Sequence, residues 1–220
     1  MRDHITYRKA FTLPEVIVAF GVLVMVIISS TDLMVSIIRS NTNNVNTLIA
    51  YGLAQEGLEA IRNVRDSNWL LGANFQGQVG NTCLWSYCLP GAGVMDYYTI
   101  SPVIKNVSGA NGNNLTDVQT YAPWQLGPAT GPDGYLAADK IKLYETKLTS
   151  DQTVWYEHCT QPCTLTPSLF SRYLEITPEI YSNASGKTMK YLVSSVVKWS
   201  EQGRDKEVRL TTELTDWKSG

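Results

Sequence analysis

The chain has 220 residues, 17% of them charged, and a formal net charge of −2 at pH 7. This length allows one domain with its own hydrophobic core and a separate N-terminal segment. A charge balance so close to neutral gives no sign of a nucleic-acid partner.

The N-terminal segment combines a short basic stretch with a long apolar run. Arg2, Arg8 and Lys9 precede thirteen apolar or glycine residues, from Val16 to Ile28. Counted from Phe11, the run makes about 27 Å of helix, close to the roughly 30 Å of a bilayer core. The basic flank predicts that the N-terminus stays in the cytoplasm and that the remaining chain is exported.

Glu15 is an acid at the start of this apolar run. An acid in the middle of a membrane costs roughly 2.5–3.5 kcal/mol, so such residues are candidates for function. An ordinary signal peptide or signal anchor does not explain Glu15, and no A-x-A cleavage site follows the run.

The stretch from Lys9 to Val16 (KAFTLPEV) resembles the prepilin cleavage site of the type IV pilin superfamily. The resemblance implies cleavage between Ala10 and Phe11 and methylation of the new Phe11 amine. It also implies that Glu15 acts in subunit assembly, by pairing with the Phe11 amine of a neighbouring subunit or of its own chain.

Two positions depart from the family pattern, while Thr12 and Leu13 match it. Ala10 stands where the family usually has glycine, and Pro14 where it has isoleucine or valine. The proline ring excludes regular helix at the carbonyl of Ala10, four residues earlier. One interpretation is that Pro14 keeps the uncut junction extended and then sits in the first turn of the mature helix; the alternative is a tolerated substitution with no role in processing.

Helix is predicted from Phe11 to about Asn68, with a bend or fraying at the asparagine-rich residues 41–46. Beyond them, apolar residues at spacings of three and four predict a face that packs on a sheet. These residues are Leu48, Tyr51, Ala54, Leu58, Ile61 and Val64. The charged residues Glu56, Glu59, Arg62 and Arg65 are expected on the other side.

Four cysteines lie in the part that we expect to be exported: Cys83, Cys88, Cys159 and Cys163. An oxidising compartment favours disulfides, and short loops favour the pairs Cys83–Cys88 and Cys159–Cys163. A zinc site remains the alternative, because C-x4-C and C-x3-C are close to zinc-finger spacing. The oxygen-rich segment Gly109–Asp117 is read as a solvated loop, with a calcium site as its alternative.

The C-terminal third predicts an antiparallel sheet, with strands at 140–146, 153–158 and 170–176 and a hairpin of 191–199 against 206–214. A two-residue turn at Gly203-Arg204 would pair Trp199 with Val208. The same register places Lys198 opposite Arg209, which is mildly unfavourable.

The order of helix and strand patterns predicts an α+β fold, a long N-terminal helix packed on a C-terminal antiparallel sheet with a loop-rich connection. The pilin resemblance implies the same fold. The expected division is a leader at 1–10, a helix at 11–68 that spans the membrane at 11–28, and an extracellular globular domain at 69–220.

No enzyme is expected. Neither His4 nor His158 has a nucleophile and a carboxylate at suggestive spacing, and the chain has no glycine-rich phosphate loop. We therefore expect no catalytic residue, no cofactor and no resident metal.

The resemblance implies a structural subunit that a prepilin peptidase and methyltransferase process. The subunit is then held in the inner membrane as a single-pass protein and assembles with other pilin subunits into a cell-surface pilus. The stretch from Tyr51 to Trp69 is similar to the minor-pilin, or pilus-modification, branch. Two alternatives stay open, a pseudopilin of a type II secretion or DNA-uptake machine and a permanently membrane-anchored surface adhesin.

Overall fold

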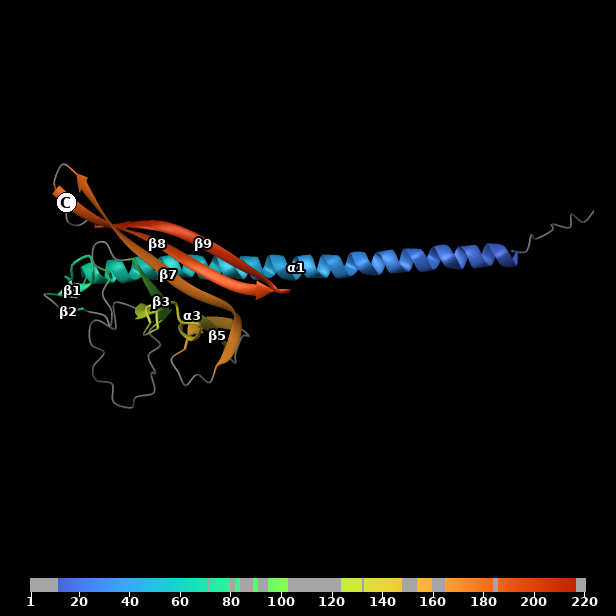
Figure 1. Cartoon of the computed structure of the whole chain (residues 1–220), viewed down its shortest axis with the longest axis horizontal. Coiled ribbons are helices and arrows are strands. Elements are labelled where there is room, and N and C mark those ends of the chain that lie inside the picture. The colour runs from blue at the N-terminus through green and yellow to red at the C-terminus, as the bar shows by residue number, and fades with distance from the viewer. Residues whose placement is uncertain are drawn as a thin grey trace, which may run out of the picture. The chain divides into compact units, whose positions relative to one another are not determined.

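The computed structural model describes residues 12–70, 72–79, 82–83, 89–90, 95–102, 124–131, 133–147, 154–159, 165–183 and 186–216. They form an α+β fold in which a long N-terminal helix, α1, precedes a series of antiparallel strands (Figure 1). The chain divides into two compact units, with the boundary between Asn46 and Thr47.

Helix α1 runs without interruption from Leu13 to Leu70. Pro14 lies in its first turn, as predicted, where the missing N–H has no intrahelical partner to lose. The asparagine-rich residues 41–46 are helical too, so the fraying expected there does not occur. The boundary between the two units directly follows this segment.

The C-terminal end of α1 is closed by a Schellman motif. Gly72 adopts a φ of 72°, a left-handed conformation that glycine takes without strain. The Ala73 N–H donates to the Asn68 carbonyl at 2.9 Å, and the Gly72 N–H to the Trp69 carbonyl at 3.1 Å. These two bonds satisfy carbonyls that the helix leaves without partners.

The second unit contains a sheet of seven antiparallel strands among the described residues. They are β3 (Asp96–Pro102), β4 (Trp124–Pro128), β5 (Lys142–Lys147), β6 (Val154–His158), β7 (Thr166–Asn183), β8 (Gly186–Glu201) and β9 (Arg204–Thr215). A separate two-stranded sheet pairs β1 (Gln78–Val79) with β2 (Thr82–Cys83).

Strand β7 is the centre of the large sheet. On one edge it pairs with β8, which in turn pairs with β9. Its other edge is shared by β5 near its start and β3 further along, with β6 and β4 outside them. The strands predicted at 153–158 and 170–176 are therefore confirmed. Residues Ala138–Ile141 instead form the short helix α3, so the strand predicted from Lys140 begins at Lys142.

The β8–β9 hairpin exists, but its predicted register was wrong. The turn is Gln202-Gly203, with φ values of 54° and 74°, one residue earlier than expected. Positive φ at both central positions is the type I′ geometry that suits the twist of a hairpin. A one-residue change in the turn shifts the pairing by two residues, and because the side-chain period is two, each residue keeps its face.

The observed register removes the predicted repulsion between Lys198 and Arg209. Lys198 lies opposite Glu207, and its Nζ is 3.5 Å from a carboxylate oxygen of that residue. Val208 lies opposite Val197 rather than Trp199.

Within the second unit, α1 lies along β7, β8 and β9 (Figure 1). The helix residues buried against the sheet include Ala50, Leu53, Ala54, Gly57, Leu58, Ala60, Ile61 and Val64. The predicted core positions Ala54, Leu58, Ile61 and Val64 are confirmed. The prediction that Leu48 and Tyr51 belong to the buried face was wrong, since their side chains are 71% and 46% exposed.

The face of α1 that packs on the sheet includes many small residues. A Cβ on Gly57 would lie only 2.5 Å from Ser195 Oγ and 3.3 Å from Leu174 Cδ2. Helix and sheet therefore approach one another too closely at this point for a larger side chain. Because the residue at this contact is a glycine, the spacing of large apolar residues in the sequence does not predict the contact.

Candidate functional site: an uncovered apolar helix

The part of α1 in the first unit presents an uncovered apolar surface. Every residue from Thr12 to Thr42 is exposed, including large side chains such as Leu13 (75%) and Ile17 (62%). Soluble monomers rarely expose contiguous apolar patches larger than a few hundred Å². This surface is therefore suited to lipid or to another protein, and the helix is long and apolar enough to cross a membrane, judged by length and composition.

Three hydroxyl side chains extend the stretch that a membrane tolerates. Ser29, Ser30 and Thr31 each donate to the carbonyl four residues earlier, at 2.9, 2.8 and 2.9 Å. Bonded to their own helix, these hydroxyls need no water. The uncharged stretch between Glu15 and Asp32 therefore runs from Val16 to Thr31.

Glu15 lies in the first turn of α1 and is exposed. The Val16 N–H donates to the Thr12 carbonyl at 3.3 Å, so the residue directly after the acid already donates a helical hydrogen bond. The positive end of the helix dipole favours a carboxylate at this position. Ala10 and Phe11 lie outside the described residues, so the cleavage site and the pairing of Glu15 with the Phe11 amine stay predictions.

The second unit holds a buried charge that the sequence analysis missed. Arg172, on β7, is fully buried beneath α1. Its guanidinium donates to the carbonyls of Leu53 on α1 and Ile100 on β3, at 3.2 and 3.1 Å. The Glu56 carboxylate lies 3.2 Å from it. Burial lowers the pKa of Arg172, and Glu56 opposes this shift.

The signal for Arg172 was present in the strand pattern. Every second residue of β7 lies on the same face of the sheet, and on the face of Arg172 the neighbours Phe170, Leu174 and Ile176 are apolar. This pattern predicts that the Arg172 side chain faces the core. A buried cation needs a partner, and Glu56 on the facing helix supplies one.

His158 lies close enough to Arg172 for their charges to interact. Its Nδ1 donates to the Lys140 carbonyl at 3.0 Å, while Nε2 is buried and finds no partner among the described residues. Burial, and then the charge of Arg172, lower the pKa of His158 to about 3. The imidazole is therefore neutral at physiological pH.

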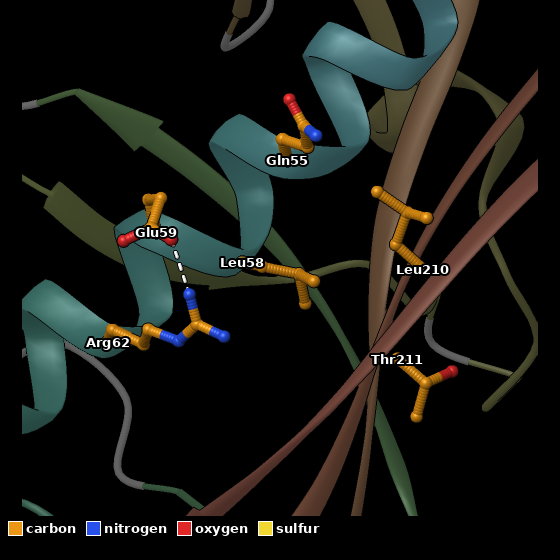
Figure 2. Close-up of a pocket in the computed structure, with 6 residues that line it drawn as sticks. All are labelled: Gln55, Leu58, Glu59, Arg62, Leu210 and Thr211. Carbon is orange, nitrogen blue, oxygen red and sulfur yellow. Dashed lines mark hydrogen bonds and ion pairs between the residues drawn. The ribbon is translucent and has the colours of Figure 1, made fainter.

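An open groove of about 370 Å³ lies between α1 and β9 (Figure 2). Its lining residues are Gln55, Leu58, Glu59, Arg62, Leu210 and Thr211. Arg62 forms an ion pair with Glu59 and donates to Thr212 Oγ1 at 2.9 Å, which ties the helix to β9. We call this feature the α1–β9 groove.

The predicted disulfides and loop sites fall largely outside the described residues. No described cysteine is free, and Cys159 is disulfide-bonded. Cys88, Cys163 and the side chain of Cys83 are not described, so the pairs Cys83–Cys88 and Cys159–Cys163 stay predictions. The segment Gly109–Asp117 also lies outside the described part of the chain.

Neither a family model nor a curated protein nor a solved structure matches the chain. The likeness to pilins therefore rests on the N-terminal motif and on the architecture. A long N-terminal helix, apolar in its first part and followed by an antiparallel sheet that packs on its last part, resembles the pilin-like fold.

Proposed function

We propose that the chain is a type IV pilin-like structural subunit, a minor pilin that is cut between Ala10 and Phe11. Its membrane-spanning helix then assembles with those of other pilin subunits into a pilus. The observation that carries the proposal is the long uncovered apolar surface of α1, with one acid, Glu15, in its first turn.

One physical property of the helix serves both stages of this function. An apolar surface is stable in lipid before assembly and against other apolar helices afterwards. The acid is tolerated in a filament because cleavage creates an amine at Phe11 that keeps its positive charge when methylated. In a dry core, a carboxylate and an ammonium stabilise one another, whereas either alone is costly.

The experiment replaces this acid and follows the protein into filaments. Glu15→Leu should insert into the membrane at least as well as the parent, because it removes a charge from the apolar run. Its amount in sheared filaments should fall by about tenfold or more, because the neighbouring amine loses its partner. Asp32→Leu is the matched control, since it removes another exposed acid of the same helix, and it should assemble like the parent.

Wild-type incorporation of Glu15→Leu would exclude the assembly role of Glu15. Retention of the parent chain in the membrane with its leader intact would identify a permanently anchored surface adhesin. A pseudopilin shares the N-terminal features and would be recovered with a secretion or DNA-uptake machine rather than with surface pili.

A further inference from the structure

Strand β9 is a long strand at one edge of the sheet. Among the described residues it pairs only with β8, so its other edge has no strand beside it. It has twelve residues and no proline, and its register with β8 continues without a bulge. The other two outer strands, β4 and β6, have five residues each. Proteins usually shorten, bend or cover such an edge, because its unpaired backbone groups attract another strand.

The hairpin turn determines which backbone groups of β9 are free. A two-residue turn makes its flanking residues, Glu201 and Arg204, a hydrogen-bonded pair, and such pairs alternate with non-bonded pairs along an antiparallel ladder. The even-numbered residues of β9 therefore bond to β8, and the odd-numbered residues direct their N–H and C=O groups to the free edge. The odd-numbered residues in the middle of the strand, all exposed, are Glu207, Arg209, Thr211 and Glu213.

The side chains of these four residues do not cover the edge. The charged ones are paired with residues of the interior strands β7 and β8, in the ion pairs Arg209–Glu175, Glu207–Lys198 and Glu213–Lys190. The hydroxyl of Thr211 likewise lies 2.9 Å from Ser194 Oγ on β8. All four side chains are therefore held over the sheet, and the backbone at its edge stays open.

On the face toward α1, this edge opens into the α1–β9 groove (Figure 2). Thr211 lines the groove, so the groove reaches the free edge, and Leu58 and Leu210 line it as well. Leu58 belongs to the hydrophobic core, and Leu210 packs against it. A strand added to β9 would direct every second side chain to this face. Apolar side chains fit there, because a charge buried against the two leucines would need a partner.

On the outer face, the charges of β9 specify an added strand further. Antiparallel pairing is the more stable arrangement per residue. In an antiparallel strand centred opposite Thr211, one residue lies opposite Glu213, and the residue four positions later lies opposite Arg209. Opposite charges across such a pair stabilise a sheet, and like charges destabilise it. The strand that fits therefore reads, from its N-terminal end, basic, apolar, hydroxyl, apolar, acidic.

We propose that the free edge of β9 binds an extended segment of another protein as an added antiparallel strand, and that this segment carries the basic–apolar–hydroxyl–apolar–acidic pattern. Backbone hydrogen bonds supply affinity in such a contact, and the alternate side chains supply specificity. The inference goes beyond the proposed function, because the contact uses β9 and not the apolar helix.

A second copy of the chain fits this edge less well. Its own β9 has a base at Arg209 and an acid at Glu213, in the same order as the pattern. Antiparallel pairing of two β9 strands would, however, turn their α1 helices in opposite directions. That arrangement does not suit two chains held in one membrane.

A synthetic peptide tests the proposed contact. A short fluorescent peptide with the central sequence lysine-valine-threonine-valine-glutamate is titrated with the detergent-solubilised full-length chain, and its anisotropy gives the Kd. The matched control peptide exchanges the lysine and the glutamate, so its composition is unchanged. We expect the first peptide to bind about tenfold more tightly, because two attractive pairs become repulsive in the control. No binding, or equal binding of both peptides, would overturn the proposal.

Amide hydrogen exchange shows where the peptide binds. An added strand should slow exchange at the N–H groups of Arg209, Thr211 and Glu213, because they point to the free edge. Leu210 and Thr212 already donate to β8 and should change little. Protection without this alternation, or protection confined to α1, would contradict strand addition. Alternating protection that appears without peptide and grows with protein concentration would mean that a second copy covers the edge, which would also overturn the proposal.

Variants of the edge give a third readout. Thr211→Pro removes an N–H from the free edge without breaking a bond to β8, and it should weaken peptide binding by about tenfold or more. Thr211→Ala is the matched control, because it loses the same hydroxyl but keeps the N–H, and it should bind like the parent. Melting temperatures establish whether both variants are folded. Unchanged binding by folded Thr211→Pro would contradict the proposal.

The variant Glu213→Gln tests the charge pattern and leaves the backbone unchanged, so it also serves if Thr211→Pro does not fold. The preference for the first peptide over the control should fall from about tenfold to about threefold, because one of the two charged pairs is lost. An unchanged preference would contradict the assigned register.

Discussion

At the scale of single residues, Arg172 links α1 to the sheet. Its guanidinium joins three elements, because it binds carbonyls on α1 and β3 from its place on β7. Glu56 compensates the buried charge from the helix side. Hydrogen bonds and ion pairs are more directional than apolar contacts, so we expect this group to favour one position of α1 along its axis.

Removing the charge of Glu56 should therefore destabilise the fold. We expect Glu56→Gln to lower the free energy of unfolding by about 1–3 kcal/mol, since Arg172 loses its ionic partner and cannot reach water. Glu59→Gln is the matched control on the same helix. Its pair with Arg62 is partly exposed, so it should change stability by less than about 1 kcal/mol. Urea unfolding of the solubilised full-length chain measures both, and equal effects would contradict the role assigned to Arg172.

His158 gives the fold a defined acid sensitivity. In the folded protein its pKa is about 3, against an ordinary value of about 6.5 in the unfolded chain. Between these values the unfolded chain binds a proton that the folded chain does not. Stability from this residue is therefore complete above about pH 6.5 and falls as the pH is lowered toward 3.

The variant His158→Asn isolates this contribution, because asparagine keeps an N–H donor for the Lys140 carbonyl but does not titrate. Between pH 7 and pH 4.5 it should lose less unfolding free energy than the parent, when both are measured by urea denaturation. The carboxylates contribute equally to both proteins and cancel in the comparison. Identical pH dependence would show that His158 is not held neutral in the fold.

At the scale of elements, the close contact of α1 with β8 depends on Gly57. Ser195 Oγ is buried there without a hydrogen-bond partner among the described residues, and a Cβ on Gly57 would meet it. Alanine favours helix over glycine by about 1 kcal/mol, but overpacking costs about 1–3 kcal/mol. At Gly57 the cost of overpacking therefore exceeds the gain in helix propensity.

We therefore expect Gly57→Ala to lower the melting temperature of the protein. Gly52→Ala should raise it, because a Cβ on Gly52 meets nothing within 4 Å and the helix gains propensity. Combining Gly57→Ala with Ser195→Ala removes the nearest clashing atom and should restore most of the loss. Stabilisation by Gly57→Ala alone would mean that the helix is free to move away from the sheet.

The same contact shows what a sequence pattern can and cannot predict. Ala54, Leu58, Ile61 and Val64 followed from their spacing, because large apolar residues at periods of three and four identify a buried face. The exposure of Leu48 and Tyr51 did not follow, because the small residues that set the buried face contribute little to such a pattern. The hairpin was predicted, but not the left-handed Gln202 that sets its register, because glutamine rarely adopts that conformation.

At the scale of the whole molecule, part of the candidate site could be predicted from the sequence and part could not. The apolar run and Glu15 were evident because a long uncharged stretch and an acid inside it are local features of the chain. The α1–β9 groove joins residues about 150 positions apart, such as Arg62 and Thr211, and only the folded sheet brings them together. The buried Arg172 needed both a strand pattern and a partner on a distant helix.

The central claim is that this chain is a pilin-like subunit that is processed at Ala10–Phe11. The most direct test is mass spectrometry of the N-terminal peptide of the protein purified from its native membranes and filaments. The account predicts a mature chain that begins at Phe11 and carries an N-methyl group. A chain that keeps residues 1–10, or one that is cut after the apolar run, would contradict it.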